Sequence, residues 1–209
     1  MLTTLGVVAA IATMWIVLRR AGHGKPYPLW LSGLLDNAVT DKLSRTTLLI
    51  ERAGVTEGMR VLDAGCGPGR LSIPLARRVG TGGIVVALDV QEGMLERVRR
   101  RAADQQLTNV RTLRSALEAN VEAPELLAAN IDRAFLVTVL GEVSDPEGAM
   151  RTLYSALKPG GVLSVTEVII DPDYQTRREV QTLGRRVGFE IEQSFGTPLA
   201  FTQNLRKPR

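Results

Sequence analysis

Three glycines at alternate positions, Gly65, Gly67 and Gly69, are the residues in this sequence best suited to hold a small ligand. They follow the apolar pair Val61–Leu62, and a segment with helical apolar spacing begins at Leu71. A strand, a glycine turn and a helix open a nucleotide-binding βαβ unit, in which glycine lets backbone N–H groups approach a ligand closely. The sequence therefore predicts a ligand crevice at this turn.

The residues around the glycines indicate the charge of that ligand. A dinucleotide-binding turn needs a third glycine where this chain has Arg70, and a phosphate-binding P-loop needs Gly-Lys-Ser/Thr, which is absent. Asp63 stands two residues before the first glycine. Its carboxylate suits a ligand with an ammonium or sulfonium charge and repels a pyrophosphate. The alternative is a glycine-rich turn with a structural role alone.

A second acid ends the next apolar run, Ile84–Asp89, and lies 20 residues beyond Gly69. Ligands of open α/β sheets bind at the carboxyl ends of the strands, and an acid about 20 residues past the glycines can bind ribose hydroxyls. Asp89 is therefore predicted to be the ribose carboxylate. The alternative is that Asp89 caps the helix predicted over residues 91–105.

The stretch from Asp63 to Gly69 resembles motif I of the class I S-adenosylmethionine (SAM) methyltransferases, D/E-x-G-x-G-x-G, and Leu157–Gly161 matches their late LKPGG turn. With Asp89 between them, the resemblance covers residues 42–208. It implies an α/β fold, a Rossmann-like three-layer sandwich with a seven-stranded, mostly parallel sheet, an antiparallel last strand and helices on both faces. Within the family, the chain is most similar to small methyltransferases of quinone biosynthesis and to phospholipid N-methyltransferases.

The resemblance also implies SAM as the cofactor. Where the family often has Gly-Asp-Ala after the third strand, this chain has Ser115-Ala116-Leu117, and Ala116 cannot bond the adenine amino group, so a backbone carbonyl or Glu118 is the expected substitute. Val90 and Met94 are expected near the adenine. The residues expected to form the cofactor site are Asp63, Gly65, Cys66, Gly67, Gly69, Asp89, Val90, Met94, Ala116, Leu117 and Val137.

Four residues are candidates for handling the methyl acceptor. Glu142 follows a strand predicted over residues 134–140, and Glu167 lies near the end of a strand predicted over residues 161–168. Both are candidate bases, with Tyr174 and Tyr27 as orienting hydroxyls. The alternatives are structural: an ion pair with an arginine for Glu167, and a helix-start or SAM-facing position for Glu142. An amine acceptor needs no base beyond water.

The composition narrows the class of protein. The 209 residues, 44% of them hydrophobic, are enough for one α/β domain with a core. The single Cys66 excludes an internal disulfide, and the single His23 excludes a histidine-based metal cluster or a Ser/His/Asp triad, so no metal site is expected. The net charge of +4 comes mainly from arginine clusters, which together favour an anionic membrane surface. Nucleic acid is disfavoured because aromatics make up only 4% and do not interleave with the basic runs.

An uncharged stretch from Leu2 to Leu18 precedes the domain. As a helix it would be about 25 Å long, the short end of what spans a bilayer core of about 30 Å. The arginines that end it place that flank in the cytoplasm, and an interfacial helix or an element packed on the domain is the alternative. The predicted organisation is a membrane anchor helix over residues 1–20, a linker and apolar lid or interfacial helix over 21–41, and a methyltransferase domain over 42–209.

These observations predict a membrane-associated methyltransferase whose catalytic domain is cytoplasmic. The predicted acceptor is a lipophilic small molecule, in the first place a phospholipid head-group amine. A quinone, phenol or thiol acceptor is the alternative. Two rival hypotheses are a protein or RNA methyltransferase tethered to the membrane and a non-catalytic SAM-binding partner protein.

Overall fold

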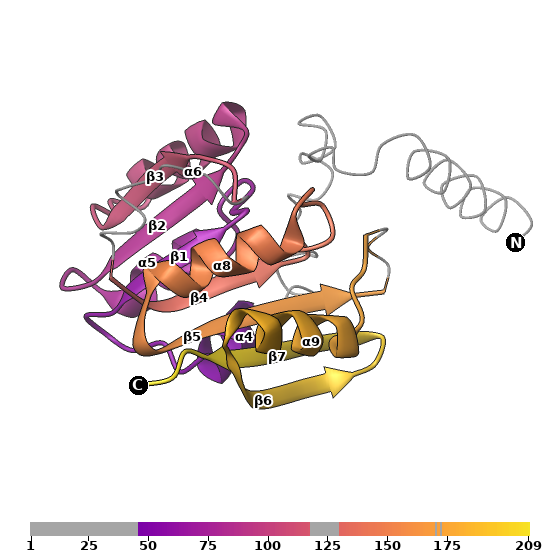
Figure 1. Cartoon of the computed structure of the whole chain (residues 1–209). Coiled ribbons are helices and arrows are strands. Elements are labelled where there is room, and N and C mark those ends of the chain that lie inside the picture. The colour runs from indigo at the N-terminus through magenta and orange to yellow at the C-terminus, as the bar shows by residue number, and fades with distance from the viewer. Residues whose placement is uncertain (1–45, 118–129, 170, 172) are drawn as a thin grey trace, which may run out of the picture.

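Seven strands form one mixed sheet in the computed structural model, which describes residues 46–117, 130–169, 171 and 173–209 (Figure 1). The order across the sheet is β3-β2-β1-β4-β5-β7-β6. The strands are β1 (Arg60–Ala64), β2 (Ile84–Asp89), β3 (Val110–Arg114), β4 (Ile131–Val137), β5 (Leu157–Val168), β6 (Glu190–Thr197) and β7 (Ala200–Arg206). The helices are α4 (Thr46–Arg52), α5 (Ser72–Val79), α6 (Glu92–Asp104), α8 (Pro146–Ala156) and α9 (Arg177–Val187).

The strand order creates a switch point at the centre of the sheet. β1 pairs in parallel with β2 on one side and with β4 on the other, so the chain builds outward from β1 and then returns to build the second half from β4. Open α/β sheets bind ligands at such a point, outside the carboxyl ends of the strands. β7 runs antiparallel to both of its neighbours, β5 and β6. The predicted α/β fold, with a mostly parallel sheet and an antiparallel last strand, is confirmed.

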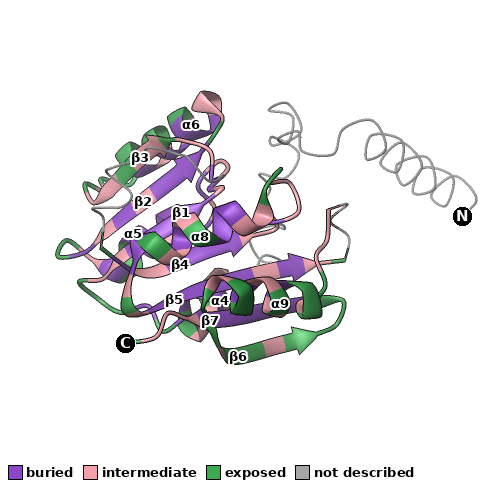
Figure 2. Cartoon of the chain, viewed as in Figure 1, coloured by how far each residue is buried: buried purple, intermediate pink, exposed green. Residues whose placement is uncertain are grey.

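Helices cover both faces of the sheet, as predicted. Val61 of β1 packs with Leu75 of α5 and Ile50 of α4, whereas its neighbour Leu62 packs with Met150 of α8. Because successive side chains of a strand point to opposite faces, α4 and α5 lie on one face and α8 on the other (Figure 1). Figure 2 shows the central strands buried between these layers, with exposed residues on the outer helix surfaces and on β6.

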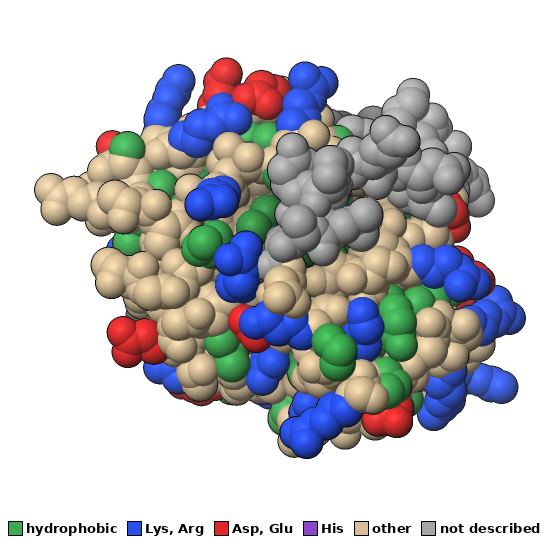
Figure 3. All heavy atoms as spheres, turned by 60° about the vertical axis from the view of Figure 1, so that its left-hand side comes forward, with side chains coloured by type: hydrophobic (Ala, Val, Ile, Leu, Met, Phe, Trp, Pro, Cys, Tyr) green, Lys and Arg blue, Asp and Glu red, His purple; other side chains and the backbone are tan. Residues whose placement is uncertain are grey.

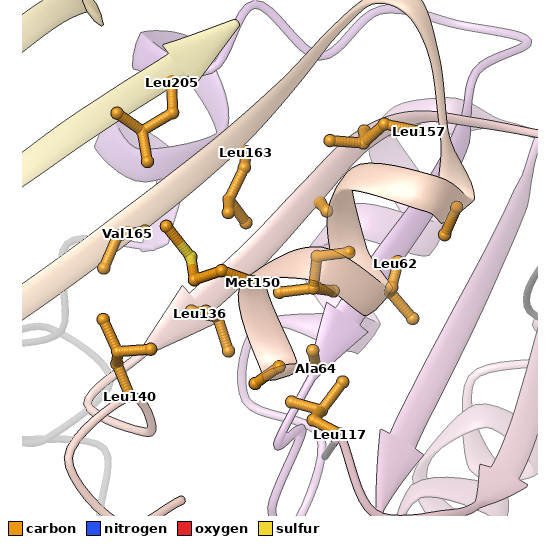
Figure 4. Close-up of a cluster of buried hydrophobic side chains, with 14 of the residues drawn as sticks. Leu62, Ala64, Leu117, Leu136, Leu140, Met150, Leu157, Leu163, Val165 and Leu205 are labelled. Atoms are coloured by element: carbon orange, nitrogen blue, oxygen red, sulfur yellow. The ribbon is translucent and has the colours of Figure 1, made fainter. Parts of the chain in front are cut away.

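The larger core cluster lies on the face that α8 and α9 cover. Leu136 and Leu163, from neighbouring strands, surround Met150 of α8, and all three side chains are fully buried (Figure 4). Burial of such a side chain stabilises the fold by about 1.5–3 kcal/mol. Ala64 and Leu117 meet in the same cluster, where β1 ends (Figure 4). The core therefore fixes the carboxyl ends of the strands relative to one another.

Local sequence signals set the starts of α8 and α9. The Oδ1 of Asp145 accepts a hydrogen bond from the N–H of Gly148 at 2.9 Å, and Pro146 occupies the first helical position. Thr176 and Glu179 form a capping box at the start of α9. Such caps are worth about 1 kcal/mol each. These caps explain why α8 begins at Pro146 and α9 at Arg177.

Strand β4 ends earlier than the sequence predicts. The expected strand ran to Leu140, but β4 ends at Val137, and the next residue, Thr138, has a φ of +54°. This conformation is strained for a β-branched residue, and the chain leaves the sheet there. The prediction was wrong because Val139 and Leu140 are apolar for another reason: Val139 packs against Gly65, and Leu140 belongs to the core.

Three predictions lie outside the described residues: the anchor helix over 1–20, the lid segment with Tyr27, and Glu118 as a substitute contact for the adenine. In the described part of the chain, no helix is long and apolar enough to cross a membrane. The N-terminal hydrophobic helix therefore stays a prediction from the sequence.

Candidate active site

The glycine turn lies at the carboxyl end of β1, beside the end of β2. Gly65, Gly67 and Gly69 have φ values of +72°, +50° and +86°, which residues with a Cβ rarely adopt. The N–H groups of Gly65 and Cys66 both donate to the carbonyl of Leu88, at 2.8 and 2.9 Å. The turn is therefore tied to the last residues of β2.

The surroundings of the glycines distinguish packing from ligand access. A Cβ on Gly65 would lie 2.5 Å from the Cγ2 of Val139, so this glycine is required by close packing. A Cβ on Gly67 would meet nothing within 4 Å. The backbone at Gly67 therefore borders open space at the switch point, where a nucleotide-like ligand can approach it.

Asp89 links this turn to β2. Its side chain is 7% exposed; the Oδ2 accepts from the N–H of Gly67 at 2.9 Å, and the Oδ1 accepts from the N–H of Gln91 at 2.9 Å. α6 begins at Glu92, and no side chain caps it, so Asp89 stabilises the loop before the helix rather than the helix end. Each carboxylate oxygen keeps a lone pair for a further donor. Asp89 thus stands where ribose hydroxyls could bind, and the ribose assignment stays a prediction.

Asp63 lies beneath the turn rather than at its open edge. It is buried at the end of β1, and its Oδ2 accepts a hydrogen bond from the Ser72 hydroxyl at 2.5 Å. Burial raises the pKa of Asp63 to about 6; the Ser72 hydrogen bond opposes the shift, and the charge of Asp89 adds to it. The carboxyl therefore joins β1 to the start of α5. The hydrogen bonds that Asp63 and Asp89 accept come from a hydroxyl and from backbone N–H groups, not from a cationic side chain. The negative character of the crevice suits a cationic ligand.

The other residues expected at the cofactor site divide into buried and accessible ones. Cys66 and Met94 are buried, and burial raises the pKa of the Cys66 thiol, so the thiol stays protonated. Leu117 is buried in the core, and Val137 packs against the cluster formed with α5. Two residues remain at the surface of the crevice: Ala116, which is partly exposed, and Val90, which is 42% exposed beside Asp89.

A second group of acids lies at the carboxyl ends of β4 and β5. We call Glu142, Glu167, Asp171 and Asp173 the carboxyl cluster. Their loops touch: a Cβ on Gly141 would lie 1.7 Å from the backbone oxygen of Asp173, so only glycine allows this approach. The sequence indicated Glu142 and Glu167 as candidate bases, but it did not indicate Asp171 or Asp173, which stand in an Asp-Pro-Asp stretch after the strand predicted over residues 161–168.

Glu167 is the most buried member of the carboxyl cluster, at 1% exposed. Among the described residues its Oε1 has no hydrogen-bond partner, and its Oε2 accepts a long bond, 3.4 Å, from the N–H of Gln175. Burial raises the pKa of Glu167 to about 8; the Gln175 bond opposes the shift, and the charges of Asp171 and Glu142 add to it. Glu167 is therefore mostly protonated at neutral pH.

Glu142 is partly exposed in the loop after β4. Burial raises its pKa to about 7, and the charges of Asp171, Asp173 and Asp89 raise it further. The N–H of Glu142 donates to the carbonyl of Val139 at 3.0 Å, and the side chain of Val139 lies against Gly65, so the loop that carries Glu142 adjoins the glycine turn. In the described residues, no group of three or more His, Cys, Asp and Glu side chains is arranged to hold a metal ion.

The tyrosines predicted to orient the acceptor are not brought together by the described structure. The Tyr174 hydroxyl donates to the carbonyl of Pro198, and its ring packs edge-on to Phe201 with centroids 6.2 Å apart. This contact fastens the loop after β5 to the turn between β6 and β7. Tyr27 lies outside the described residues. The role of both hydroxyls toward an acceptor stays a prediction.

Comparison with known proteins identifies the family. Residues 55–192 match the family model described as a methyltransferase domain. The ubiquinone/menaquinone biosynthesis C-methyltransferase UbiE of Shewanella sp. (strain W3-18-1) is 34% identical over 134 residues, 64% of this chain and 52% of that protein. The chain thus spans about half the length of the curated relatives it matches.

Solved structures agree on the fold. A SAM-dependent methyltransferase from Aquifex aeolicus has a TM-score of 0.77 at 23% identity, and the match covers 87% of this chain and 99% of that one. The [4+2]-cyclase SpnF has a TM-score of 0.67 at 20% identity, covering 81% and 82%. Since SpnF is named for a different reaction, this fold alone does not fix the chemistry. The family match and the built crevice do so for the reaction class: the chain belongs to the methyltransferase-domain family and is a class I SAM-dependent methyltransferase.

Proposed function

We propose that this methyltransferase acts on a lipophilic small molecule, and that the main acceptor is a ring of the quinone or phenol type. The observation that carries the proposal is the contact between two sites: Val139, whose side chain lies against Gly65 of the glycine turn, accepts a hydrogen bond at 3.0 Å from the N–H of Glu142 of the carboxyl cluster. A titratable carboxyl within reach of the cofactor can take a proton from a phenolic hydroxyl. The UbiE relatives are named as methyltransferases of ubiquinone and menaquinone biosynthesis, which supports the choice of a quinone-type ring.

The residues of the cofactor crevice fit SAM. The backbone at Gly67 borders open space, Asp89 keeps acceptor capacity for ribose hydroxyls, and Val90 lies exposed beside it, toward the expected adenine. When bound, SAM supplies an electrophilic methyl group whose leaving group is a neutral thioether. The task of the chain is then to hold the acceptor in line with that methyl group and to exclude water.

A phospholipid head-group amine is the second candidate acceptor. The observation in its favour is the acidic character of the acceptor side: Glu142, Asp171 and Asp173 are acidic residues beside the protonated Glu167, and the ion pairs found among the described residues do not include Glu142 or Asp173. Negative charge there attracts an ammonium group. A ring acceptor would instead use the same carboxyls as proton carriers.

The proposed membrane association rests on the N-terminal sequence and on surface charge. Residues 1–20 are proposed to be the anchor and 21–41 the linker and lid, with the catalytic domain in the cytoplasm. Figure 3 shows Lys and Arg side chains spread over the face that carries β3 and α6, and α6 itself contributes Arg97, Arg99, Arg100 and Arg101. Such a face supports contact with anionic lipid. Deleting residues 1–20 should release the protein from vesicles while SAM binding persists; a truncated protein that still sediments with vesicles contradicts the anchor.

The acceptor is tested by incubating the full chain with labelled SAM and a total lipid extract, then separating labelled quinol-type products from labelled aminophospholipids. Label in the quinol fraction supports the main proposal, and label in the phospholipid fraction favours the second candidate. Asp89→Ala serves as the control, since it should lose label in either fraction. A protein that binds SAM but forms no S-adenosylhomocysteine with any extract would instead be a non-catalytic SAM-binding partner.

A further inference from the structure

Glu167 presents a polar atom whose burial the fold itself does not explain. Its Oε1 is buried without a hydrogen-bond partner in the part of the chain that the structure describes, and the residue is 1% exposed. An unpartnered buried polar group costs about 1–3 kcal/mol, and a charged one costs more. A carboxyl at the end of a central strand that keeps this cost is expected to have a partner from outside the chain.

No positive side chain neutralises Glu167 in the contacts described. The groups that face it are the N–H of Gln175, which donates weakly, and the charges of Asp171 and Glu142, which repel it. Tyr174 stands in the same loop, directly before Gln175. Arg177, in the helix after this loop, is engaged in part elsewhere: its Nη2 donates to the carbonyls of residues 195–197, and its guanidinium lies 5.2 Å from the centre of the Phe201 ring, while its Nε is buried without a hydrogen-bond partner among the described residues.

Backbone packing holds Glu142 near Glu167. Gly141 lies against the backbone of Asp173, so the loop after β4 is fixed against the loop after β5. The strained φ of Thr138, +54°, turns the chain out of the sheet just before this contact. Strain of this kind persists where the surrounding structure enforces it, and it concentrates at functional sites. The two glutamates therefore belong to one rigid arrangement.

We propose that Glu142 and Glu167 act as one carboxyl pair on the acceptor: Glu167, through the O–H of its protonated carboxyl, donates a hydrogen bond to the acceptor, and Glu142 removes the proton from the acceptor's nucleophilic group. The inference rests on the proposed function but not on which of the two acceptors is right. A quinol hydroxyl, whose loss of a proton makes the ring nucleophilic, and a lipid ammonium, whose loss of a proton frees the nitrogen lone pair, share the chemistry that matters: a proton must leave the acceptor before it takes the methyl group.

The proton step balances within the pair. The O–H or N–H bond of the acceptor breaks, its electron pair stays on the acceptor, and the proton forms a bond to a carboxylate oxygen of Glu142. Glu167 keeps its own proton throughout and is not consumed. Two interacting acids in unequal environments divide these roles, the more buried one staying protonated. Glu142 is the more exposed of the two carboxyls, and the charge of Asp89 acts on it. It is therefore the carboxyl that can release its proton to solvent after each turnover.

The protonation state can be measured without cofactor or acceptor. Infrared difference spectra of the full chain, recorded as the pH rises through neutrality, should show a carboxylic-acid carbonyl band at pH 7 that is lost at higher pH. Glu167→Gln should remove most of this band, whereas Glu147→Gln, an exposed glutamate of α8 paired with Arg151, should leave it unchanged. A wild-type spectrum without a protonated carboxyl at pH 7 overturns the assignment of Glu167.

Kinetics separate the two roles. Glu142→Gln should lower kcat by about 10²–10⁴, the range for loss of a general base, and should remove the rise of kcat with pH around 7, with SAM affinity by calorimetry unchanged. Glu167→Leu should raise KM for the acceptor about fivefold, the scale of one hydrogen bond, and Glu167→Gln should lose less because an amide still donates. Glu147→Gln should match the wild type in all three measurements.

Two results have different meanings. If the wild type forms no methylated product from quinol or aminophospholipid, the proposed function fails. If the wild type forms product and Glu142→Gln keeps both the wild-type kcat and its pH profile, the carboxyl pair is refuted while the proposed function stands.

Discussion

The two halves of the site are built by different means. On the cofactor side, backbone groups do most of the work: three left-handed glycines, N–H groups bonded to the carbonyl of Leu88, and one carboxylate, Asp89, that accepts two further N–H groups. On the acceptor side, side chains dominate, and the carboxyl of Glu167 keeps an unpartnered oxygen. The polar groups named on the cofactor side have hydrogen-bond partners within the chain, whereas Oε1 of Glu167 on the acceptor side has none among the described residues.

This difference separates binding from chemistry. A satisfied network is rigid before the ligand arrives, which favours a cofactor that every turnover needs. An unsatisfied, protonated carboxyl stores free energy that a bound acceptor can release. The loops that meet at Gly141 and Asp173 keep this cost in place.

Replacing one glycine with alanine in each half of the site should have the largest effect and should show whether the two halves can be disrupted separately. In Gly65→Ala the Cβ would lie 2.5 Å from the Cγ2 of Val139 at a φ of +72°, and in Gly141→Ala it would lie 1.7 Å from the backbone oxygen of Asp173. Overpacking of this kind costs typically about 1–3 kcal/mol and at times more. We expect Gly65→Ala to lose SAM binding, and Gly141→Ala to bind SAM but lose methyl transfer.

Calorimetry with SAM and single-turnover product assays distinguish these outcomes. Gly58→Ala is the matched control, since its φ is also positive, at +79°, but its Cβ would meet nothing within 4 Å. It should cost only the left-handed backbone, about 1–2 kcal/mol of stability, and should keep both functions. If Gly141→Ala lost SAM binding as completely as Gly65→Ala, the two halves would not be separable.

The same contrast explains what the sequence reveals. The sequence alone identifies Gly65, Gly67, Gly69 and Asp89 as site residues because backbone geometry restricts which residue types can occupy their positions. Hydrophobic periodicity located most of the strands and helices. The end of β4 was misplaced because Val139 and Leu140 continue an apolar run after the chain has left the sheet.

The acceptor side is harder to predict because its chemistry comes from burial. The sequence around Glu167 does not show whether its carboxyl lies at the surface or is, as observed, 1% exposed. The charges of Asp171 and Asp173 act on Glu142 across a contact between two loops. Asp63 shows the same limit on the cofactor side: its position before the first glycine predicted a ligand-facing charge, whereas its recorded bond is to Ser72. Packing between segments far apart in the chain determines the environments of these carboxyls, and the spacing of residues along the sequence does not reveal that packing.

Stability should depend on pH through the acceptor side. Burial raises the pKa of Glu167 to about 8 from 4.5, the ordinary value of a glutamate, so above pH 4.5 the folded chain binds more protons than the unfolded chain. The free energy of unfolding therefore falls as the pH rises from about 4.5 to about 8 and is unaffected by this group below that window. Glu167→Gln removes the titration and should be stabilising at pH 7–8, by on the order of 2–3 kcal/mol relative to its effect at pH 4.

Urea unfolding of both proteins at pH 4, 6 and 8 measures this difference. Glu147→Gln, on the exposed surface of α8, should show no such dependence. A variant with the same stability difference at every pH would mean that Glu167 is ionised in the folded chain, and the contrast between the two halves would weaken.

On the cofactor side, Asp89→Ala should weaken SAM binding by about 1.5–3 kcal/mol, or about 10- to 150-fold in Kd, the scale of hydrogen bonds to a charged group. It also frees the N–H groups of Gly67 and Gln91. Asp89→Asn keeps an acceptor oxygen and should lose less. Titration calorimetry with SAM tests both, and an unchanged Kd for Asp89→Ala would refute the ribose assignment.

Tyr174→Phe should have the smallest effect, and it tests where the acceptor side ends. The substitution removes the hydrogen bond to the carbonyl of Pro198 but keeps the ring against Phe201, so the expected loss is about 0.5–1.5 kcal/mol of stability. If the hydroxyl serves only to fasten the two loops, kcat and KM stay near the wild-type values once the variant is assayed well below its melting temperature. A fall in kcat without a matching loss of stability would instead place the Tyr174 hydroxyl at the acceptor, because a loop fastener acts on catalysis only through the fold.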